Sequence, residues 1–158
     1  MIEKILELID FSQTSFWISF ASILFNPIFW NSMARKEYKT RFITRAAGGN
    51  PYIGCYRLAT TIFSLGLLRD YLYHRAIEHQ PTLPELNNYQ VKLSGAILFG
   101  SGMLFVISST YMLGITGTFL GDYFGILMNE RVTSFPFNVL EHPMYYGSTM
   151  SFLGTALW

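Results

Sequence analysis

Residues 93–121 read LSGAILFGSGMLFVISSTYMLGITGTFLG and carry no charged side chain. As an α-helix this stretch would be about 43 Å long, which exceeds the ~30 Å hydrocarbon core of a bilayer. It therefore predicts a membrane-spanning helix that tilts, bends or protrudes. Small residues recur in it at seven-residue intervals, a stripe typical of tight helix packing: they are Gly95, Gly102, Ser109 and Thr116.

The composition of the whole chain also indicates a membrane protein. Of its 158 residues, 51% are hydrophobic and 13% are charged, and the charged share is about half of the roughly 25% found in soluble proteins. The net charge is +1, and no basic patch is interleaved with aromatic residues, so no nucleic-acid partner is indicated. The single cysteine, Cys55, excludes an internal disulfide and supports no zinc site. We expect no metal centre.

Three further apolar segments accompany the long one. Residues 15–30 form a short run that Asn26-Pro27 interrupts, which fits either a span or a re-entrant segment. Residues 52–68 form a second run, which Arg69-Asp70 is expected to stop. The final run, residues 144–158, would make about 22 Å of helix, short of a full crossing.

These segments predict the fold class and the domain organisation. We expect an all-α integral membrane bundle of three to four helices, with a first segment that either spans the membrane or is re-entrant and a last helix that is incomplete. The whole of residues 1–158 then forms one membrane-embedded domain, truncated at its C-terminus. Residues 2–9 predict a short amphipathic helix, either at the membrane surface or packed on the rest of the chain.

The segments between the apolar runs are predicted to be mostly loops. The loop after Trp30 is basic and either solvated or in contact with anionic headgroups; its charged residues are Arg35, Lys36, Glu37, Lys39, Arg41 and Arg45. Residues 71–92 are predicted to form a loop with a helical first half. His74 and His79 in that segment are five positions apart, a poor metal-ligand spacing on a helix, and are predicted to be surface residues.

The stretch from Gly117 to Gly147 contains the candidates for chemistry. Three glycines recur in it every four residues and would line one face of a helix, where another backbone or a second copy of the chain can approach closely; they are Gly117, Gly121 and Gly125. Asp122 lies beside that face, and Glu141 and His142 precede the last apolar run. Ionisable residues at the ends of membrane helices are functional candidates. The structural alternative makes Asp122 a solvated acid and Glu141 a neighbour of a helix N-cap.

Five strings of this chain resemble the phosphatidylethanolamine N-methyltransferases, small membrane enzymes that make phosphatidylcholine. They are FNPIFWNSMARKEYKT (25–40), PYIGCY (51–56), GTFLGDYFGIL (117–127), RVTSFPFN (131–138) and PMYYGST (143–149). The segment HPMYYG (142–147) is also similar to the HPxYxG pattern of isoprenylcysteine carboxyl methyltransferases. In those proteins the pattern contributes to the S-adenosylmethionine pocket.

The resemblance implies S-adenosylmethionine as the methyl donor. The family's first cofactor motif, GxG, falls on Gly100-Ser101-Gly102, which read alone would indicate packing. The HPMYYG segment implies that His142 and Tyr145 also line the cofactor pocket. The family's second motif, a pair of adjacent glutamates after the last span, would lie beyond Trp158. A chain truncated there is expected to insert into membranes but to have little activity.

The resemblance also implies a reaction and a setting. The methyl group would move to the ethanolamine nitrogen of phosphatidylethanolamine, a bilayer lipid, and two repeats would give phosphatidylcholine. The setting would be the endoplasmic reticulum membrane, including its mitochondria-associated part, with a multi-pass topology. Because the nucleophile must be the neutral amine, a proton acceptor is needed, and Glu141, Asp122 and His142 are the candidates. The rings of Tyr123, Tyr145 and Tyr146 would face the cationic products.

Two other functions remain open on the sequence. One is a non-catalytic truncated isoform that binds lipid or pairs with the full-length enzyme through its glycine faces. The other is a carboxyl methyltransferase that acts on a prenylated cysteine. The sequence gives two conflicting indications of membrane orientation. A cytosolic cofactor places residues 71–92 on the cytosolic side, whereas the basic residues after Trp30 favour a cytosolic location for the loop that contains them. We follow the chemical requirement.

Overall fold

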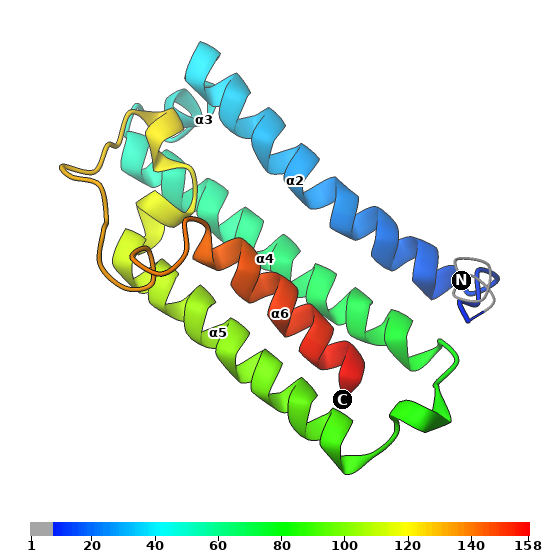
Figure 1. The fold of residues 1–158 in the computed structure, drawn as a ribbon. Coiled ribbons are helices and arrows are strands. Elements are labelled where there is room, and N and C mark those ends of the chain that lie inside the picture. The colour runs from blue at the N-terminus through cyan, green and yellow to red at the C-terminus, as the bar shows by residue number, and fades with distance from the viewer. Residues whose placement is uncertain (1–7) are drawn as a thin grey trace.

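The computed structural model describes residues 8–158, and this part of the chain is all-helical, which confirms the all-α part of the expected fold class (Figure 1). Residues 2–7 of the predicted N-terminal amphipathic helix lie outside the described residues. The elements are α2 (Thr14–Thr40), α3 (Phe42–Ala46), α4 (Pro51–Glu78), η1 (Pro84–Leu86), α5 (Tyr89–Thr118), η2 (Gly121–Phe124) and α6 (Pro143–Leu157).

The long helices run alternately up and down (Figure 1). Helix α5 packs most extensively on α6, and α2 packs on α4. We call one end of the bundle the η2 end; it holds α3, η2, the start of α4 and residues 125–142. The opposite end, with the described N-terminal residues and η1, is the η1 end. The Tyr73 hydroxyl of α4 donates to the Phe152 carbonyl of α6 at 3.0 Å and links the two helix pairs.

One segment of the described residues, Tyr89–Phe124, is long and apolar enough to cross a membrane by length and composition. It contains the uncharged stretch that predicted a span. The expected bend is also present, because Gly114 inside α5 has non-helical torsion angles, φ 64° and ψ −179°. Only glycine adopts such a conformation readily.

Helix α2 differs from its prediction. It continues through Asn26-Pro27 to Thr40, so the expected interruption is wrong and so is the loop expected over residues 31–40. Proline removes a backbone donor inside the helix, but tertiary contacts hold the two halves in line. The Asn26 side chain is buried and its Nδ2 donates to the Leu65 carbonyl of α4 at 3.2 Å.

Helix α4 continues beyond the apolar run from which it was predicted. Arg69-Asp70 does not stop the helix, which continues to Glu78. The two charges are tolerated because they pair, with Arg69 Nη2 and Asp70 Oδ1 2.8 Å apart. The prediction that residues 71–92 begin as a helix is confirmed, and His74 and His79 are exposed as expected.

The glycine face predicted over Gly117, Gly121 and Gly125 does not form. Helix α5 ends at Thr118, and Gly121 begins the short 3₁₀ turn η2. Leu120 between them adopts left-handed torsion angles, with φ 62°, and Gly125 follows η2 with φ 80°. These backbone conformations end the helical repeat, so the three glycines share no helix face.

The seven-residue stripe on α5 packs tightly, as predicted, and its partner is α6. A Cβ atom added at Gly147 would lie 2.6 Å from the Gly102 carbonyl oxygen, and one added at Gly154 would lie 2.6 Å from the Gly95 carbonyl oxygen. Because nothing but hydrogen fits at these four positions, the two backbones approach closely. This contact sets the register of α6 on α5.

A small core and a buried carboxylate hold the η2 end together. Cys55, Leu58 and Phe124 form the core. Glu37 is fully buried, and its carboxylate accepts hydrogen bonds from the Ile43 N–H at 2.7 Å, the Thr44 N–H at 3.3 Å and the Thr44 hydroxyl. Two of these donors are N–H groups in the first turn of α3, so the Glu37 side chain caps the N-terminus of that helix. The sequence placed Glu37 in a solvated loop, which is wrong.

Candidate active site

A surface hollow of about 470 Å³ lies at the η2 end, between α5 and the segment that precedes α6. Its lining consists of Leu113, Met128, Asn129, Glu130, Arg131, Val132, Phe137 and Glu141. Only Leu113 comes from a helix; the others belong to residues 125–142. This segment is positioned by η2, whose Phe124 carbonyl accepts a hydrogen bond from Arg41 Nη1 at 2.6 Å.

The charged side chains of the hollow are Glu130, Arg131 and Glu141, and all three are exposed. Two carboxylates and one guanidinium leave it with one net negative charge, which favours a cationic or ammonium-bearing group. A carboxylate in this position also accepts protons. The structure thus brings Glu141 together with an acidic residue, Glu130, and a basic residue, Arg131, which the sequence analysis did not identify as site residues. The sequence feature that could have indicated them is the polar run Asn129-Glu130-Arg131 between two apolar segments.

His142 and Tyr145 lie at the start of α6. The His142 carbonyl accepts hydrogen bonds from the N–H groups of Tyr145 at 3.1 Å and Tyr146 at 3.3 Å, which begins the helix before Pro143. The His142 and Tyr145 rings meet edge to face with 6.1 Å between centroids. Both side chains are exposed. Their ring faces are therefore accessible to a ligand.

Asp122 and Tyr123 lie elsewhere. They belong to η2, which packs against α2, α4 and α5. Asp122 is exposed but does not line the hollow that contains Glu141. The Tyr123 ring packs edge to face on Tyr38 of α2, with 6.2 Å between centroids. Asp122 and Glu141 are therefore two separate candidate acids.

The GxG motif is divided between two sides of α5. Residues two apart on a helix point about 200° apart, and Gly102 is buried against α6 whereas Gly100 is exposed. A Cβ atom at Gly100 would meet nothing within 4 Å. A Cβ atom at Gly102 would lie 2.8 Å from the Ser151 nitrogen. Gly102 is thus a packing residue in this structure, while Gly100 and Ser101 remain accessible, Ser101 in part.

The predicted site residues form two groups along α5. Gly102 lies opposite Gly147, so Tyr145, two residues earlier on α6, lies within about one helical turn of the GxG motif. Glu141 lies instead with Leu113, which is about 16 Å along α5 from Gly102. Tyr145 and the accessible part of GxG therefore lie at a similar height along the bundle axis, whereas Glu141 lies closer to the η2 end.

The chain was compared with known proteins. The family model described as phospholipid methyltransferase matches residues 91–158, which include α5, the hollow and α6. Phosphatidyl-N-methylethanolamine N-methyltransferase of Neurospora crassa is 60% identical over 156 residues, which are 99% of this chain and 73% of that protein. The enzyme of the same name from Saccharomyces cerevisiae is 51% identical over 158 residues, 100% of this chain and 76% of that protein.

A human relative extends the comparison. Phosphatidylethanolamine N-methyltransferase of Homo sapiens is 46% identical over 154 residues, 98% of this chain and 77% of that protein. This chain belongs to the phospholipid methyltransferase family. No solved structure is significantly similar to it. The resemblance noted in the sequence is therefore confirmed, and in this family member the matched residues 91–158 contain every predicted site residue.

Proposed function

We propose that this chain is a phospholipid N-methyltransferase that transfers methyl groups from S-adenosylmethionine to phosphatidylethanolamine and its mono- and dimethyl derivatives. The observation that carries the proposal is the similarity of nearly the whole chain to enzymes that are named for these activities. It favours catalysis over the non-catalytic alternative. The apolar segment Tyr89–Phe124 supports a place in the bilayer, where the lipid substrate resides.

Glu141 is the proton acceptor in this proposal. The amine nitrogen attacks the methyl carbon with its lone pair, the methyl–sulfur bond breaks, and the nitrogen gains a methyl group. The amine must first lose its ammonium proton, and a positioned carboxylate takes it. Glu141 lies in a hollow with net negative charge, which attracts the ammonium form. His142, next in the chain, is the second candidate, and Asp122 in η2 is the third.

The accessible part of the GxG motif, together with His142 and Tyr145, would hold the cofactor. Gly100 and Ser101 leave room beside α5 for a ligand. The Tyr145 ring lies near the same depth and its face is open. An aromatic face attracts a cationic centre such as a sulfonium or a methylated ammonium. S-adenosylmethionine, when bound, supplies the methyl group.

The setting proposed is the endoplasmic reticulum membrane, including its mitochondria-associated part, with a multi-pass topology. The η1 end would face the cytosol, where the cofactor is dissolved. The oligomer expected through glycine faces is not part of this proposal. Gly95 and Gly102 are occupied by α6 of the same chain, and the other three glycines share no helix face.

An assay of methyl transfer tests the function. The purified chain is incubated with radiolabelled S-adenosylmethionine and phosphatidylethanolamine liposomes, with the Saccharomyces cerevisiae relative as positive control. Glu141→Gln should lower the rate by about 10²-fold or more, because it removes the proton acceptor. Glu85→Gln, an exposed acid in η1, is the matched control and should not change it. Asp122→Asn tests whether the aspartate of η2 is the proton acceptor instead.

Three outcomes are informative. No methylated lipid from the wild-type chain, beside an active relative, would contradict the proposed function. Methylated lipid formed by the wild-type chain at a rate comparable with that of the relative would support the proposed function. Loss of activity in Asp122→Asn with a normal Glu141→Gln variant would assign the proton acceptor to η2.

A second test concerns the cofactor. Gly100→Leu should lower S-adenosylmethionine affinity by about tenfold or more, because the added side chain would occupy the space beside the motif, while a helix-favouring residue keeps α5 stable. Isothermal titration calorimetry in detergent measures the affinity. Gly66→Leu on α4 is the control, since a Cβ atom there also meets nothing within 4 Å. Unchanged affinity in a folded Gly100→Leu protein would place the cofactor elsewhere.

A further inference from the structure

An ion pair inside α4 has no role in the site described above. Arg69 and Asp70 are adjacent, and their side chains are 23% and 52% exposed. Arg69 Nε and Nη2 both donate to a single oxygen, Asp70 Oδ1, at 3.0 and 2.8 Å. Within residues 8–158, Asp70 Oδ2 accepts no hydrogen bond and Arg69 Nη1 donates none. One carboxylate oxygen of Asp70 and one guanidinium nitrogen of Arg69 therefore have no hydrogen-bond partner among the described residues.

The pair lies well inside the helix. Arg69 is nine residues before the end of α4 at Glu78, about 14 Å along the axis. The guanidinium lies over the Phe152 ring of α6, 5.0 Å from its centroid. Ionisable groups at such a depth are costly and mark binding sites more often than packing contacts.

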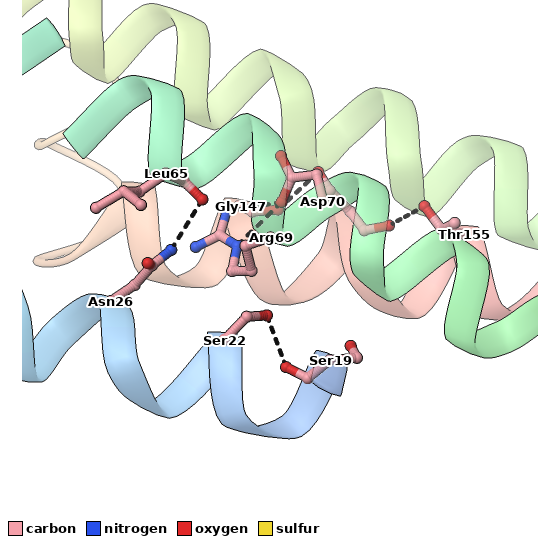
Figure 2. Close-up of polar contacts among 9 residues, drawn as sticks. Ser19, Ser22, Asn26, Leu65, Arg69, Asp70, Gly147 and Thr155 are labelled. Carbon is pink, nitrogen blue, oxygen red and sulfur yellow. Dashed lines mark hydrogen bonds and ion pairs between the residues drawn. The ribbon is translucent and has the colours of Figure 1, made fainter. Parts of the chain in front are cut away.

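Helix α2 presents a polar face to the same region. Ser15, Ser19, Ser22 and Asn26 are spaced by four, three and four residues, so they share one helix face. Ser19 and Asn26 are buried, and Asn26 bonds to Leu65, one turn before Arg69 on α4. Figure 2 shows the Arg69 side chain between α4 and this face of α2. Ser15 Oγ is buried and has no hydrogen-bond partner among the described residues.

A purely structural role does not account for this arrangement. Apolar residues would hold α2, α4 and α6 together without the desolvation cost of two charges. The groups without a partner within residues 8–158 are one positive donor, Arg69 Nη1, and one negative acceptor, Asp70 Oδ2, whereas the Ser22 hydroxyl donates to the Ser19 carbonyl at 2.7 Å. A phosphate accepts hydrogen bonds from a guanidinium and from hydroxyls, and an ammonium donates to a carboxylate. The set matches the two charges of a zwitterionic headgroup.

We propose that Arg69 and Asp70, with the polar face of α2, bind the headgroup of a zwitterionic phospholipid, Arg69 at the phosphate and Asp70 at the ammonium. The inference rests on the proposed function, whose substrate is such a lipid. The site lies at the depth of the cofactor motif. Phe152, which contacts Arg69, follows Ser151, and Ser151 lies against Gly102. An ammonium bound there would face Asp70 and not Glu141, so the headgroup site is a docking position separate from the hollow in which Glu141 takes the proton.

Native mass spectrometry of the purified chain in detergent tests the inference. The probes are phosphatidylethanolamine, phosphatidic acid, which lacks the ammonium, and diacylglycerol, which lacks both charges. We expect the wild-type chain to retain phosphatidylethanolamine best and diacylglycerol least. Arg69→Gln should weaken retention of both phospholipids by about tenfold or more. Asp70→Asn should weaken phosphatidylethanolamine alone and remove its preference over phosphatidic acid.

The chain offers a matched pair of controls. Arg75 and Glu78 lie on the same helix, form an ion pair at 3.1 Å and are 51% and 44% exposed at their side chains. Arg75→Gln and Glu78→Gln should leave the lipid preferences unchanged. Arg69→Lys keeps the positive charge and should retain much of the phosphate binding, which separates a lost ligand contact from a lost fold.

Wild-type preferences in folded Arg69→Gln and Asp70→Asn would overturn the inference. Equal weakening for all three lipids, diacylglycerol included, would also overturn it, because it would indicate a packing role. The proposed function fails separately: a chain with the expected preferences but no methyl transfer would contradict only the function. An active chain without headgroup preference would contradict only the headgroup site.

Discussion

Gly102→Leu is expected to abolish the native contact between α5 and α6. An added Cβ atom would lie 2.5 Å from Ser151 Oγ and 2.8 Å from the Ser151 nitrogen, besides contacting the Gly147 carbonyl. Backbone atoms cannot rotate away as a side chain does, so the helices must separate. Overpacking of this kind costs about 3 kcal/mol or more, a large part of the stability of a small domain.

The single cysteine reports this loss. Cys55 is fully buried under Phe124 at the η2 end, so its reaction with a thiol-specific fluorophore during heating in detergent follows unfolding. Gly100→Leu is the matched control, because it places the same side chain two residues away with no atom within 4 Å of its Cβ. We expect a low midpoint for Gly102→Leu and a wild-type midpoint for Gly100→Leu. Equal midpoints would show that α6 does not pack on Gly102.

Glu37→Ala is expected to have the second large effect. Its carboxylate is fully buried and serves donors from Ile43 and Thr44. Alanine would leave these donors without partners and create a cavity. Hydrogen bonds to charged groups contribute about 1.5–3 kcal/mol each, so we expect a loss of about 3 kcal/mol or more and a disordered junction between α2 and α3.

The same thiol assay measures this effect, because Ile43 packs against the core that contains Cys55. Glu37→Gln keeps the shape and one acceptor, so it should lose less stability than Glu37→Ala. Glu85→Ala, an exposed acid in η1, should change nothing measurable. Cys55 protection in Glu37→Ala equal to that of the wild type would show that the carboxylate is not the cap of α3.

The helical architecture and one tightly packed helix face were predictable from sequence because they depend on local regularities. The uncharged residues 93–121 predicted a long apolar helix, and the seven-residue recurrence of Gly95 and Gly102 predicted close packing. Gly147 and Gly154 on α6 have the same spacing. That the two stripes face each other was not predictable, because either could have met another helix or a second copy of the chain.

The candidate site was predictable only in part. Glu141, His142 and Tyr145 were identified from their place before an apolar run and from a family motif. The grouping of Glu141 with Glu130 and Arg131 depends on the path of residues 125–142, which η2 and its bond to Arg41 determine. The depth that separates Glu141 from Gly102 depends on the register of α6, which the glycine contact sets.

Tertiary structure alone decided the places of several charged and conformationally unusual residues. Sequence reasoning assigned Glu37 to a solvated loop and Arg69 to the end of an apolar run, since an isolated charge avoids burial. Glu37 is buried because the α3 N–H groups satisfy its carboxylate, and Arg69, which is partly exposed, is held by Asp70 and by the Phe152 ring. The break after Thr118 likewise depends on contacts of η2 with α2 and α4. Residue type and spacing describe what a segment prefers alone, but the way the chain turns and the helices pack decides which charges find partners and can be buried.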